Sequence, residues 1–413
     1  MRVLFTTYAE KTHFLAMAPL AWALRTAGHE VVFASQRKFA GTINQAGLTA
    51  VPVGSDRDPW RLLEANPGWL DGGHLTVTPP YDVAQQPEKA TWDHLLTGYR
   101  EAVTWWHKLI NVPMIPDLVE FARHWRPDLV IWEPLTYAGA VAAKTVGAAH
   151  ARLMWGLDVF GVTRDHFLRL KGERDEDPLA EWLGSYVEFS EDLATGHFTI
   201  DRLPGSLRIE ADLRYVPMRF VPYGGAAVVP DWLRTPPSRP RVAITMGFSA
   251  TDHFGGYLFG MQDILDAIGD LDIDIVATIP DEERRKLTRV PPGARLVPYV
   301  PLHALAPTCA AAIHHAGPGT LATFALDAVP QLALPMHYDE PPLARMLAEQ
   351  GAALAVDPRE ATGEIVRDAL LRLLKEPSFT EGAERLRAEI LDLPSPGRLV
   401  PRLEELTAEH RAA

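Results

Sequence analysis

Within the first 35 residues the chain alternates strand and helix in an order that few folds accommodate. Residues 2–7 predict a short buried strand, because an apolar run of β-favouring residues there ends in polar residues. Apolar side chains then recur at helical spacing from Phe14 to Leu24. Gly28 suits the end of that helix, and residues 30–35 predict a second strand. A strand, a helix and a strand joined this closely predict a parallel sheet that helices cover.

The same alternation continues along the chain. Residues 127–133 predict a further buried strand, and an alanine-rich helix is expected at residues 138–146. Before them, residues 56–111 contain five tryptophans and show only weak periodicity: Trp60, Trp69, Trp92, Trp105 and Trp106. Helical packing and an aromatic-lined pocket for a large apolar ligand both fit that segment.

A proline-rich stretch divides the chain. Residues 217–240 hold six prolines and no sustained period, which is typical of a linker. Further strands are expected at residues 241–246, 273–278, 296–297, 311–313 and 331–334, and helices at residues 257–268, 320–328 and 342–350. Because 413 residues exceed one compact core, we predict an N-terminal domain (1–216), a linker (217–240), a C-terminal domain (241–390) and a helical segment (391–413) that packs back on the N-terminal domain. Two such α/β domains face each other across a cleft between the carboxyl ends of their sheets.

Charge and cysteine content narrow the range of partners. Lys and Arg total 40, Asp and Glu total 53, and the net charge of -13 disfavours nucleic acid or an anionic membrane as the main partner. The single cysteine, Cys309, excludes a disulfide framework and a cysteine-based zinc site, and it fits a reducing compartment. Since the chain shows neither a signal-peptide pattern nor an apolar run long enough to span a bilayer, we expect a cytoplasmic protein.

Residues 311–320 carry the most informative chemistry, because a buried strand leads through two histidines and two glycines into the start of a helix. Backbone N–H groups and the positive end of the helix dipole at such a start can bind a diphosphate. Gly317 and Gly319 let the anion approach the backbone closely. Thr320 can cap the helix or donate its hydroxyl to phosphate, and His315 can donate a ring N–H.

Residues 311–320 also have interpretations other than a diphosphate site. The plain alternative is that His314 and His315 are a pair of core residues and that the glycines only form a turn. Metal binding is disfavoured, because adjacent residues at a strand end diverge and neither a His-Glu-x-x-His spacing nor a cysteine set completes a site. Asp272 and Asp274 have the spacing of a cation clamp, but they flank an apolar strand. A dinucleotide-dependent oxidoreductase is also disfavoured, since residues 6–11 after the first strand contain no glycine.

The block from Cys309 to Pro335 resembles the donor-binding signature of family 1 glycosyltransferases, which have the α/β GT-B fold of two facing Rossmann-like domains. The similarity is greatest to actinomycete antibiotic glycosyltransferases that attach deoxysugars or aminodeoxysugars to macrolides and related polyketides, such as desosaminyl and mycaminosyl transferases. It covers nearly the whole chain, including residues 12–14, 19–29, 132–134 and 300–305.

The resemblance assigns the donor site to the C-terminal domain. It implies that the diphosphate is bound by His315, Gly317, Gly319, Thr320 and Ser249. The base of a thymidine nucleotide is expected at Val300, Pro301 and Leu302, and donor hydroxyls at Asp339 and Glu340. The family more often has Trp at position 338, Gln at 340, and Gly and Ala at 316 and 318. These departures bear on the identity of the sugar more than on phosphate binding.

Catalysis requires a base near the acceptor. His13 lies in the loop expected after the first strand, at the cleft end of the sheet, and a neutral imidazole suits deprotonation of a hydroxyl near pH 7. Glu133 ends a neighbouring strand, so that its carboxylate can reach the other ring nitrogen, fix the tautomer and stabilise the imidazolium. The resemblance supports both residues, although the family commonly has Asp where Glu133 stands.

The resemblance and these residues predict an inverting glycosyltransferase of antibiotic biosynthesis. It would move a deoxysugar, expected to be an aminodeoxysugar, from a TDP-sugar to a hydroxyl of a hydrophobic polyketide aglycone, with no metal and no other cofactor. A catalytically inactive companion or regulator that keeps the nucleotide site is one alternative, and a sugar-nucleotide epimerase on the same fold is another. Residues 153–209 resemble the macrolide subgroup, which implies a helper protein homologous to cytochrome-type monooxygenases that docks on the N-terminal domain.

Overall fold

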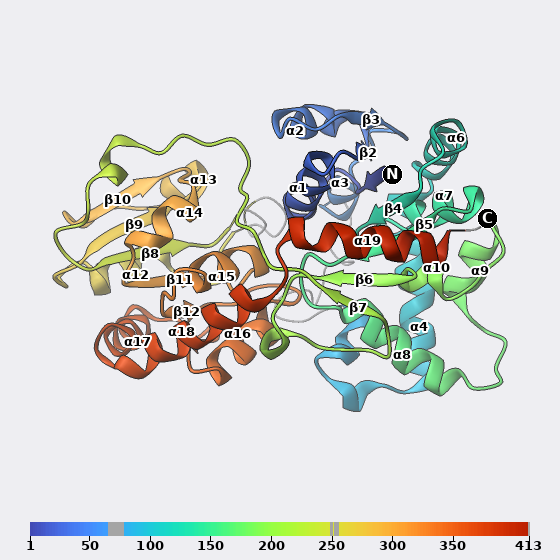
Figure 1. Ribbon diagram of the computed structural model, residues 1–413. Coiled ribbons are helices and arrows are strands. Elements are labelled where there is room, and N and C mark those ends of the chain that lie inside the picture. The colour runs from blue at the N-terminus through green and yellow to red at the C-terminus, as the bar shows by residue number, and fades with distance from the viewer. Residues whose placement is uncertain (65–77, 248–250, 252–255, 412–413) are drawn as a thin grey trace.

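The computed structural model describes residues 1–64, 78–247, 251 and 256–411, and it places two parallel sheets side by side (Figure 1). The N-terminal sheet has the order β3-β2-β1-β4-β5-β6-β7, and all neighbouring strands are parallel. Its strands are β1 (Arg2–Thr6), β2 (Glu30–Ser35), β3 (Ala50–Pro52), β4 (Leu129–Trp132), β5 (Ala149–Leu153), β6 (Phe198–Asp201) and β7 (Tyr215–Pro217). The central strand β4 is apolar and wholly buried, as expected of a parallel sheet covered on both faces.

The C-terminal sheet repeats this plan with the order β10-β9-β8-β11-β12-β13. Its parallel strands are β8 (Arg241–Thr245), β9 (Asp274–Thr278), β10 (Ala294–Val297), β11 (Ala311–His314), β12 (Gln331–Ala333) and β13 (Ala353–Ala355). The expectation of two facing α/β domains is therefore confirmed.

Helices surround both sheets (Figure 1). Those of the first half are α1 (Lys11–Thr26), α2 (Ala40–Gln45), α3 (Pro59–Glu64), α4 (Trp92–Ala102), α5 (Lys108–Asn111), α6 (Ile115–Trp125), α7 (Ala138–Val146), α8 (Val159–Lys171), α9 (Pro178–Gly184) and α10 (Asp192–Thr195). Those of the second half are α12 (Met261–Ile268), α13 (Asp281–Arg284), α14 (Leu302–Leu305), α15 (Pro318–Ala325), α16 (Glu340–Glu349), α17 (Gly363–Lys375), α18 (Pro377–Asp392) and α19 (Pro396–His410). None of the helices in the part of the chain that the structure describes is long and apolar enough to cross a membrane.

The last helix returns to the first half of the chain. Figure 1 shows α19, in red, lying across the N-terminal domain, where it contacts α1 and β5. Leu399, Leu403 and Leu406 are buried in the same apolar core as residues of β1 and α1. Beside this return, the backbone N–H of Arg219 in the linker donates to the carbonyl of Pro394 at 2.8 Å. The two passages of the chain between the domains are thus bonded to each other.

Several elements begin where the sequence patterns did not predict. Helix α1 already begins at Lys11, so His13 lies in its first turn and not in a loop. The reason is Glu10, whose carboxylate accepts the N–H of Thr12 at 3.3 Å and caps the helix, although glutamate is not among the favoured capping residues. Helix α12 begins at Met261, later than expected, and α15 begins at Pro318, earlier than expected.

The tryptophan-rich segment is mostly helical where it is described. Trp92 begins α4 and its ring lies 5.3 Å from that of Phe167, while the rings of Trp60 and Trp106 meet at 5.3 Å. Residues 103–107 form a π-helical turn between α4 and α5. Trp69 lies outside the described residues. These contacts support the helical packing that the sequence allowed for this segment.

Candidate active site

The N-terminal half of the candidate site lies where the strand order of its sheet reverses. Strands β1 and β4 are neighbours, with Thr6 paired to Trp132, and the chain leaves them toward opposite edges of the sheet. His13 follows the carboxyl end of β1, and Glu133 directly follows β4. Such a reversal leaves a crevice in which open parallel sheets bind ligands.

His13 and Glu133 meet beside this reversal. The Nδ1 atom of His13 lies 3.1 Å from Oε2 of Glu133, and both side chains are buried. The ring N–H is not aligned on that oxygen, so the contact is electrostatic in this structure. Catalytic hydrogen bonds in ligand-free enzymes are often loose and tighten when substrate binds. The predicted pair is therefore brought together.

Several donors fix the Glu133 carboxylate. It accepts the N–H of Leu135 at 3.0 Å, the hydroxyl of Thr136, and the indole N–H of Trp155 at 3.3 Å. The Trp155 ring also stacks on the His13 ring, with centroids 4.5 Å apart and an interplanar angle of 12°. One indole therefore orients both members of the pair. Sequence patterns did not identify Trp155, although it belongs to the segment that resembles the macrolide subgroup.

The C-terminal half of the site lies at the corresponding reversal in the second sheet. Strands β8 and β11 are neighbours, and His315 follows β11 while Gly247 follows β8. Gly247 has a φ of +65°, and a Cβ added there would lie 2.6 Å from Nε2 of His315. Glycine is required at this position both by its backbone conformation and by the proximity of the imidazole.

Helix α15 begins beside this imidazole. Gly317 is its N-cap residue and Pro318 its first residue, so the early N–H groups have no partner within the helix. Gly319 is exposed, with nothing within 4 Å of where its Cβ would lie, and Thr320 is half-buried. The glycine turn, the helix start and His315 thus meet as the predicted diphosphate site requires.

The two adjacent histidines have different surroundings. His314 is fully buried, with Nε2 2.6 Å from Oε1 of Gln331 and Nδ1 accepting the N–H of Ala316 at 2.9 Å. Burial lowers the pKa of His314 to about 3. His314 is therefore a core residue, as the plain alternative predicted for both, whereas His315 lies at the helix start.

The other residues predicted to bind the TDP-sugar lie near α15 or outside the described residues. Val300 is buried, and Pro301 caps α14, which packs against α15. Leu302 is the half-buried first residue of α14. Ser249 lies outside the described residues. The expected base-binding loop is thus beside the expected diphosphate site, and its role stays a prediction.

Tyr338 joins the two domains. Its ring lies 5.6 Å from that of Trp155 and 6.3 Å from that of Phe160, both of the N-terminal domain. The side-chain amide of Gln85 donates to the Tyr338 carbonyl at 2.8 Å. Because Trp155 also stacks on His13, a continuous series of contacts leads from the His13 pair to the segment before α16.

Asp339 and Glu340 directly follow Tyr338 in the chain. Oδ2 of Asp339 accepts the N–H of Leu157 at 2.9 Å across the domain boundary, and burial raises the pKa of this carboxyl to about 7. Oε1 of Glu340 lies 2.7 Å from Nδ1 of His315. Both carboxyls are buried and already have protein partners. Their predicted contact with donor hydroxyls stays a prediction.

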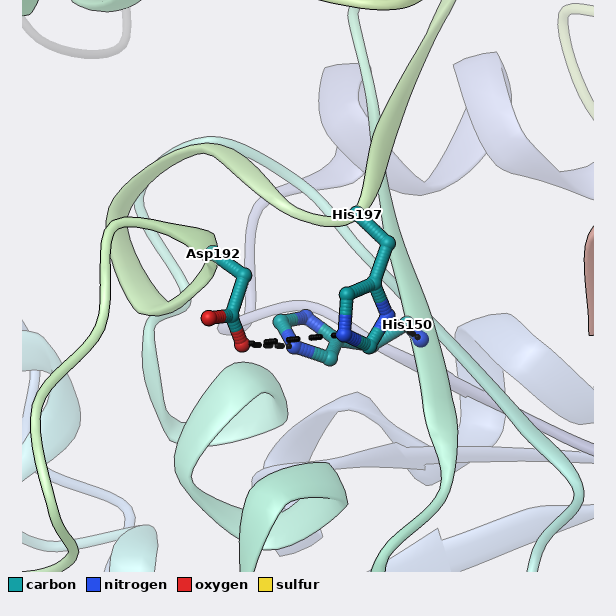
Figure 2. Close-up of side chains that lie close together, drawn as sticks. All are labelled: His150, Asp192 and His197. Atoms are coloured by element: carbon teal, nitrogen blue, oxygen red, sulfur yellow. Dashed lines mark hydrogen bonds and ion pairs between the residues drawn. The ribbon is translucent and has the colours of Figure 1, made fainter. Parts of the chain in front are cut away.

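A second cluster of titratable groups lies at the amino ends of strands β5 and β6 of the N-terminal sheet. His150 is the second residue of β5, His197 precedes β6, and both rings approach the same oxygen of Asp192, at 3.0 and 3.7 Å (Figure 2). Their potential ligand atoms lie within 4.8 Å of one another, which is close enough for a shared metal ion. No sequence pattern had joined these three residues.

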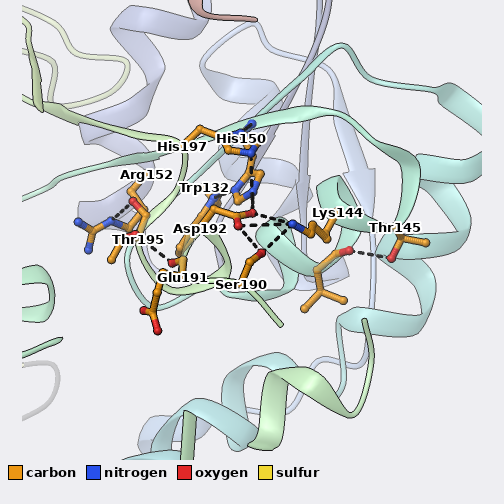
Figure 3. Close-up of polar contacts among 11 residues, drawn as sticks. Trp132, Lys144, Thr145, His150, Arg152, Ser190, Glu191, Asp192, Thr195 and His197 are labelled. Atoms are coloured by element: carbon orange, nitrogen blue, oxygen red, sulfur yellow. Dashed lines mark hydrogen bonds and ion pairs between the residues drawn. The ribbon is translucent and has the colours of Figure 1, made fainter. Parts of the chain in front are cut away.

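The hydrogen bonds of this cluster oppose metal binding. Trp132 donates its indole N–H to Nδ1 of His150 at 3.2 Å, and the backbone N–H of His150 donates to Nδ1 of His197 at 3.1 Å. Each neutral ring must therefore carry its proton on Nε2, the atom that a metal would need. Figure 3 shows Lys144 beside Asp192, with its Nζ 3.4 Å from the carboxylate. The cluster is best described as a structural network.

Comparisons with known proteins show the family of this chain. The profile of the Erythromycin biosynthesis protein CIII-like N-terminal domain matches residues 22–247, and that of the corresponding C-terminal domain matches residues 262–406. The chain is 47% identical to 10-deoxymethynolide desosaminyltransferase of Streptomyces venezuelae, over 100% of this chain and 98% of that protein. It is 44% identical to TDP-daunosamine transferase DnrS of Streptomyces peucetius, over 100% of this chain and 98% of that protein.

A solved structure shares the architecture as well as the sequence. The crystal structure of glycosyltransferase VinC in complex with DTDP has a TM-score of 0.87 and 40% identity, over 99% of this chain and 100% of that chain. The chain therefore belongs to the Erythromycin biosynthesis protein CIII-like family and is a glycosyltransferase of the GT-B fold.

Proposed function

We propose that this enzyme transfers an aminodeoxysugar from a thymidine diphosphate donor to a hydroxyl of a macrolide or related polyketide aglycone. The observation that carries the proposal is a series of contacts that begins at His13 and leads through Trp155 to Tyr338. Tyr338 lies two residues before Glu340, which contacts His315. This series sets an acid–base pair of one domain opposite a helix start of the other. Relatives named for transferring desosamine and TDP-daunosamine support the class of sugar and of nucleotide.

In the proposed reaction His13 removes the proton of the acceptor hydroxyl. The acceptor oxygen then forms a bond to the anomeric carbon, while the bond from that carbon to the diphosphate oxygen breaks and its electron pair leaves with the diphosphate. Attack from the face opposite the leaving group inverts the anomeric configuration. Glu133 lies 3.1 Å from Nδ1 and stabilises the imidazolium that forms, and Trp155 holds both groups in place.

The departing diphosphate carries the negative charge that develops in this step. The start of α15 offers unpaired backbone N–H groups and the positive end of a helix dipole, and His315 adds a ring N–H beside them. Donors held in place before the reaction stabilise this charge without further reorganisation. We propose that the C-terminal domain supplies the needed positive potential by these groups, with no metal ion required.

Replacement of His13 by alanine tests the proposal. We expect the rate of transfer to fall by about 100-fold or more, the range for loss of a general base, while TDP affinity changes little. Transfer is measured as TDP release and as glycosylated product by mass spectrometry, with a panel of TDP-sugars and aglycones. His124→Ala, on an exposed position of α6, is the matched control. Unchanged turnover by His13→Ala would contradict the assignment.

The same assay separates the alternatives. An inactive companion would bind the TDP-sugar without releasing TDP, and an epimerase would convert the donor without any aglycone. We also propose a helper protein, homologous to cytochrome-type monooxygenases, that docks on the N-terminal domain in the cytoplasm. Full turnover by the purified enzyme alone would refute the need for it.

A further inference from the structure

Glu340 begins α16, and both of its carboxylate oxygens already have partners. Oε2 accepts the backbone N–H groups of Met336 at 2.7 Å and of His337 at 2.8 Å. Oε1 lies 2.7 Å from Nδ1 of His315. The side chain is 10% exposed. Glu340 is thus oriented toward His315 and its own helix start, although the sequence predicted a contact with donor hydroxyls.

The imidazole of His315 is held between two elements. Its Nδ1 edge faces Glu340, and its Nε2 lies beside Gly247 in the turn that follows β8. That turn and the start of α15 flank the proposed diphosphate position. The ring therefore has one edge bound by protein and the other directed to the turn where an anion is expected.

The short contact between Glu340 and His315 requires a proton between the two atoms. The two amide donors at Oε2 stabilise the carboxylate form, which places that proton on Nδ1. In this structure the N–H of Gly317 is also directed at Nδ1, at 3.0 Å, so it competes with Glu340 for that atom. When Nδ1 carries the proton, this N–H has no acceptor there and can turn to an anion.

The number of hydrogen bonds that the His315 ring donates decides its protonation state when the TDP-sugar is bound. A neutral imidazole donates from one nitrogen only, whereas an imidazolium donates from both. Donation from Nδ1 to Glu340 and from Nε2 to a phosphate oxygen therefore requires the imidazolium. In the part of the chain that the structure describes, the carboxyls that interact with this ring are those of Glu340 of α16 and Asp339 just before it, and the adjacent His314 is buried and neutral.

We propose that Glu340 is a positioning residue, which holds His315 by Nδ1 and balances the charge of the imidazolium so that Nε2–H is donated to the donor diphosphate. This inference rests on the proposed function. It gives Glu340 a role in binding the leaving group, in place of the expected role in recognising the sugar.

Glu340→Gln tests the inference in the full-length protein, because glutamine keeps the shape and removes the charge. Glu349→Gln, an exposed change of the same kind at the other end of α16, is the control. Calorimetric titration with TDP and with thymidine separates diphosphate binding from base binding. We expect Glu340→Gln to weaken TDP binding about tenfold or more and to leave thymidine binding unchanged, the loss typical of a hydrogen bond between charged groups.

A double variant distinguishes an effect through His315 from an effect on folding. In a His315→Ala background, Glu340→Gln should cause no further loss of TDP affinity, because the residue through which it acts is gone. Unchanged TDP affinity with a raised KM for the TDP-sugar would overturn the inference and restore the sugar-binding role. Equal losses for TDP and thymidine would also overturn it, since they indicate a general structural effect. Failure of the wild type to bind TDP would instead refute the proposed function itself.

Discussion

Replacing Gly247 by alanine should damage diphosphate binding more than it damages the fold. The φ of +65° at this position costs a residue other than glycine about 1–2 kcal/mol. The new Cβ would lie 2.6 Å from Nε2 of His315. Normal van der Waals separation is about 3.5 Å, so the ring must retreat by about 1 Å. A hydrogen bond from Nε2 that lengthens by that much is lost. The expected weakening of TDP binding is therefore about 10- to 150-fold, the equivalent of about 1.5–3 kcal/mol.

Gly28 provides a matched control for this prediction. It also has a positive φ, +93°, but nothing lies within 4 Å of where its Cβ would be. Both alanine variants should lose about 1–2 kcal/mol of unfolding free energy in denaturant titrations, because both strain the backbone. Only Gly247→Ala should lose TDP affinity in calorimetric titrations. The reasoning would be refuted if the two variants bound TDP equally well, or lost equal affinity.

Two further predictions concern buried titratable groups. Burial raises the pKa of Asp339 to about 7, so between pH 4 and 7 the folded protein holds a proton that the unfolded chain has released. The free energy of unfolding should therefore fall as the pH rises through that range, by up to about 1.4 kcal/mol per pH unit, and Asp339→Asn should flatten this slope. An identical slope for both proteins in denaturant titrations would contradict the raised pKa. The hydrogen bonds around His150 and His197 should prevent metal binding, so that added Zn²⁺ leaves the Tm unchanged. A rise in Tm that His150→Ala abolishes would show that a metal does bind there.

Patterns that repeat within one strand–helix unit predicted the fold well. Alternation of apolar strands with helices identified both parallel sheets. It also placed Glu133 and His315 correctly at strand ends, because the carboxyl end of a parallel strand is where its loop begins. The meeting of His13 with Glu133 followed from the adjacency of β1 and β4.

Features that depend on how separate segments pack could not be predicted in this way. The stacking of Trp155 on His13 and the bond from Leu157 to Asp339 depend on tertiary and interdomain placement. The start of α1 depended on Glu10, an unusual capping residue. Likewise the network of His150, Asp192 and His197 comes from three segments with no shared sequence motif.

The bond between Arg219 and Pro394 has a mechanical consequence for the enzyme. Two domains that are joined by a single segment of chain can both rotate and twist about that segment. Here a hydrogen bond joins the outgoing and returning crossings, so we expect rotation of the domains about this bond to be easier than sliding of one domain past the other. Entry of a bulky aglycone would accordingly separate Tyr338 from Trp155 while His13 and His315 keep their lateral alignment.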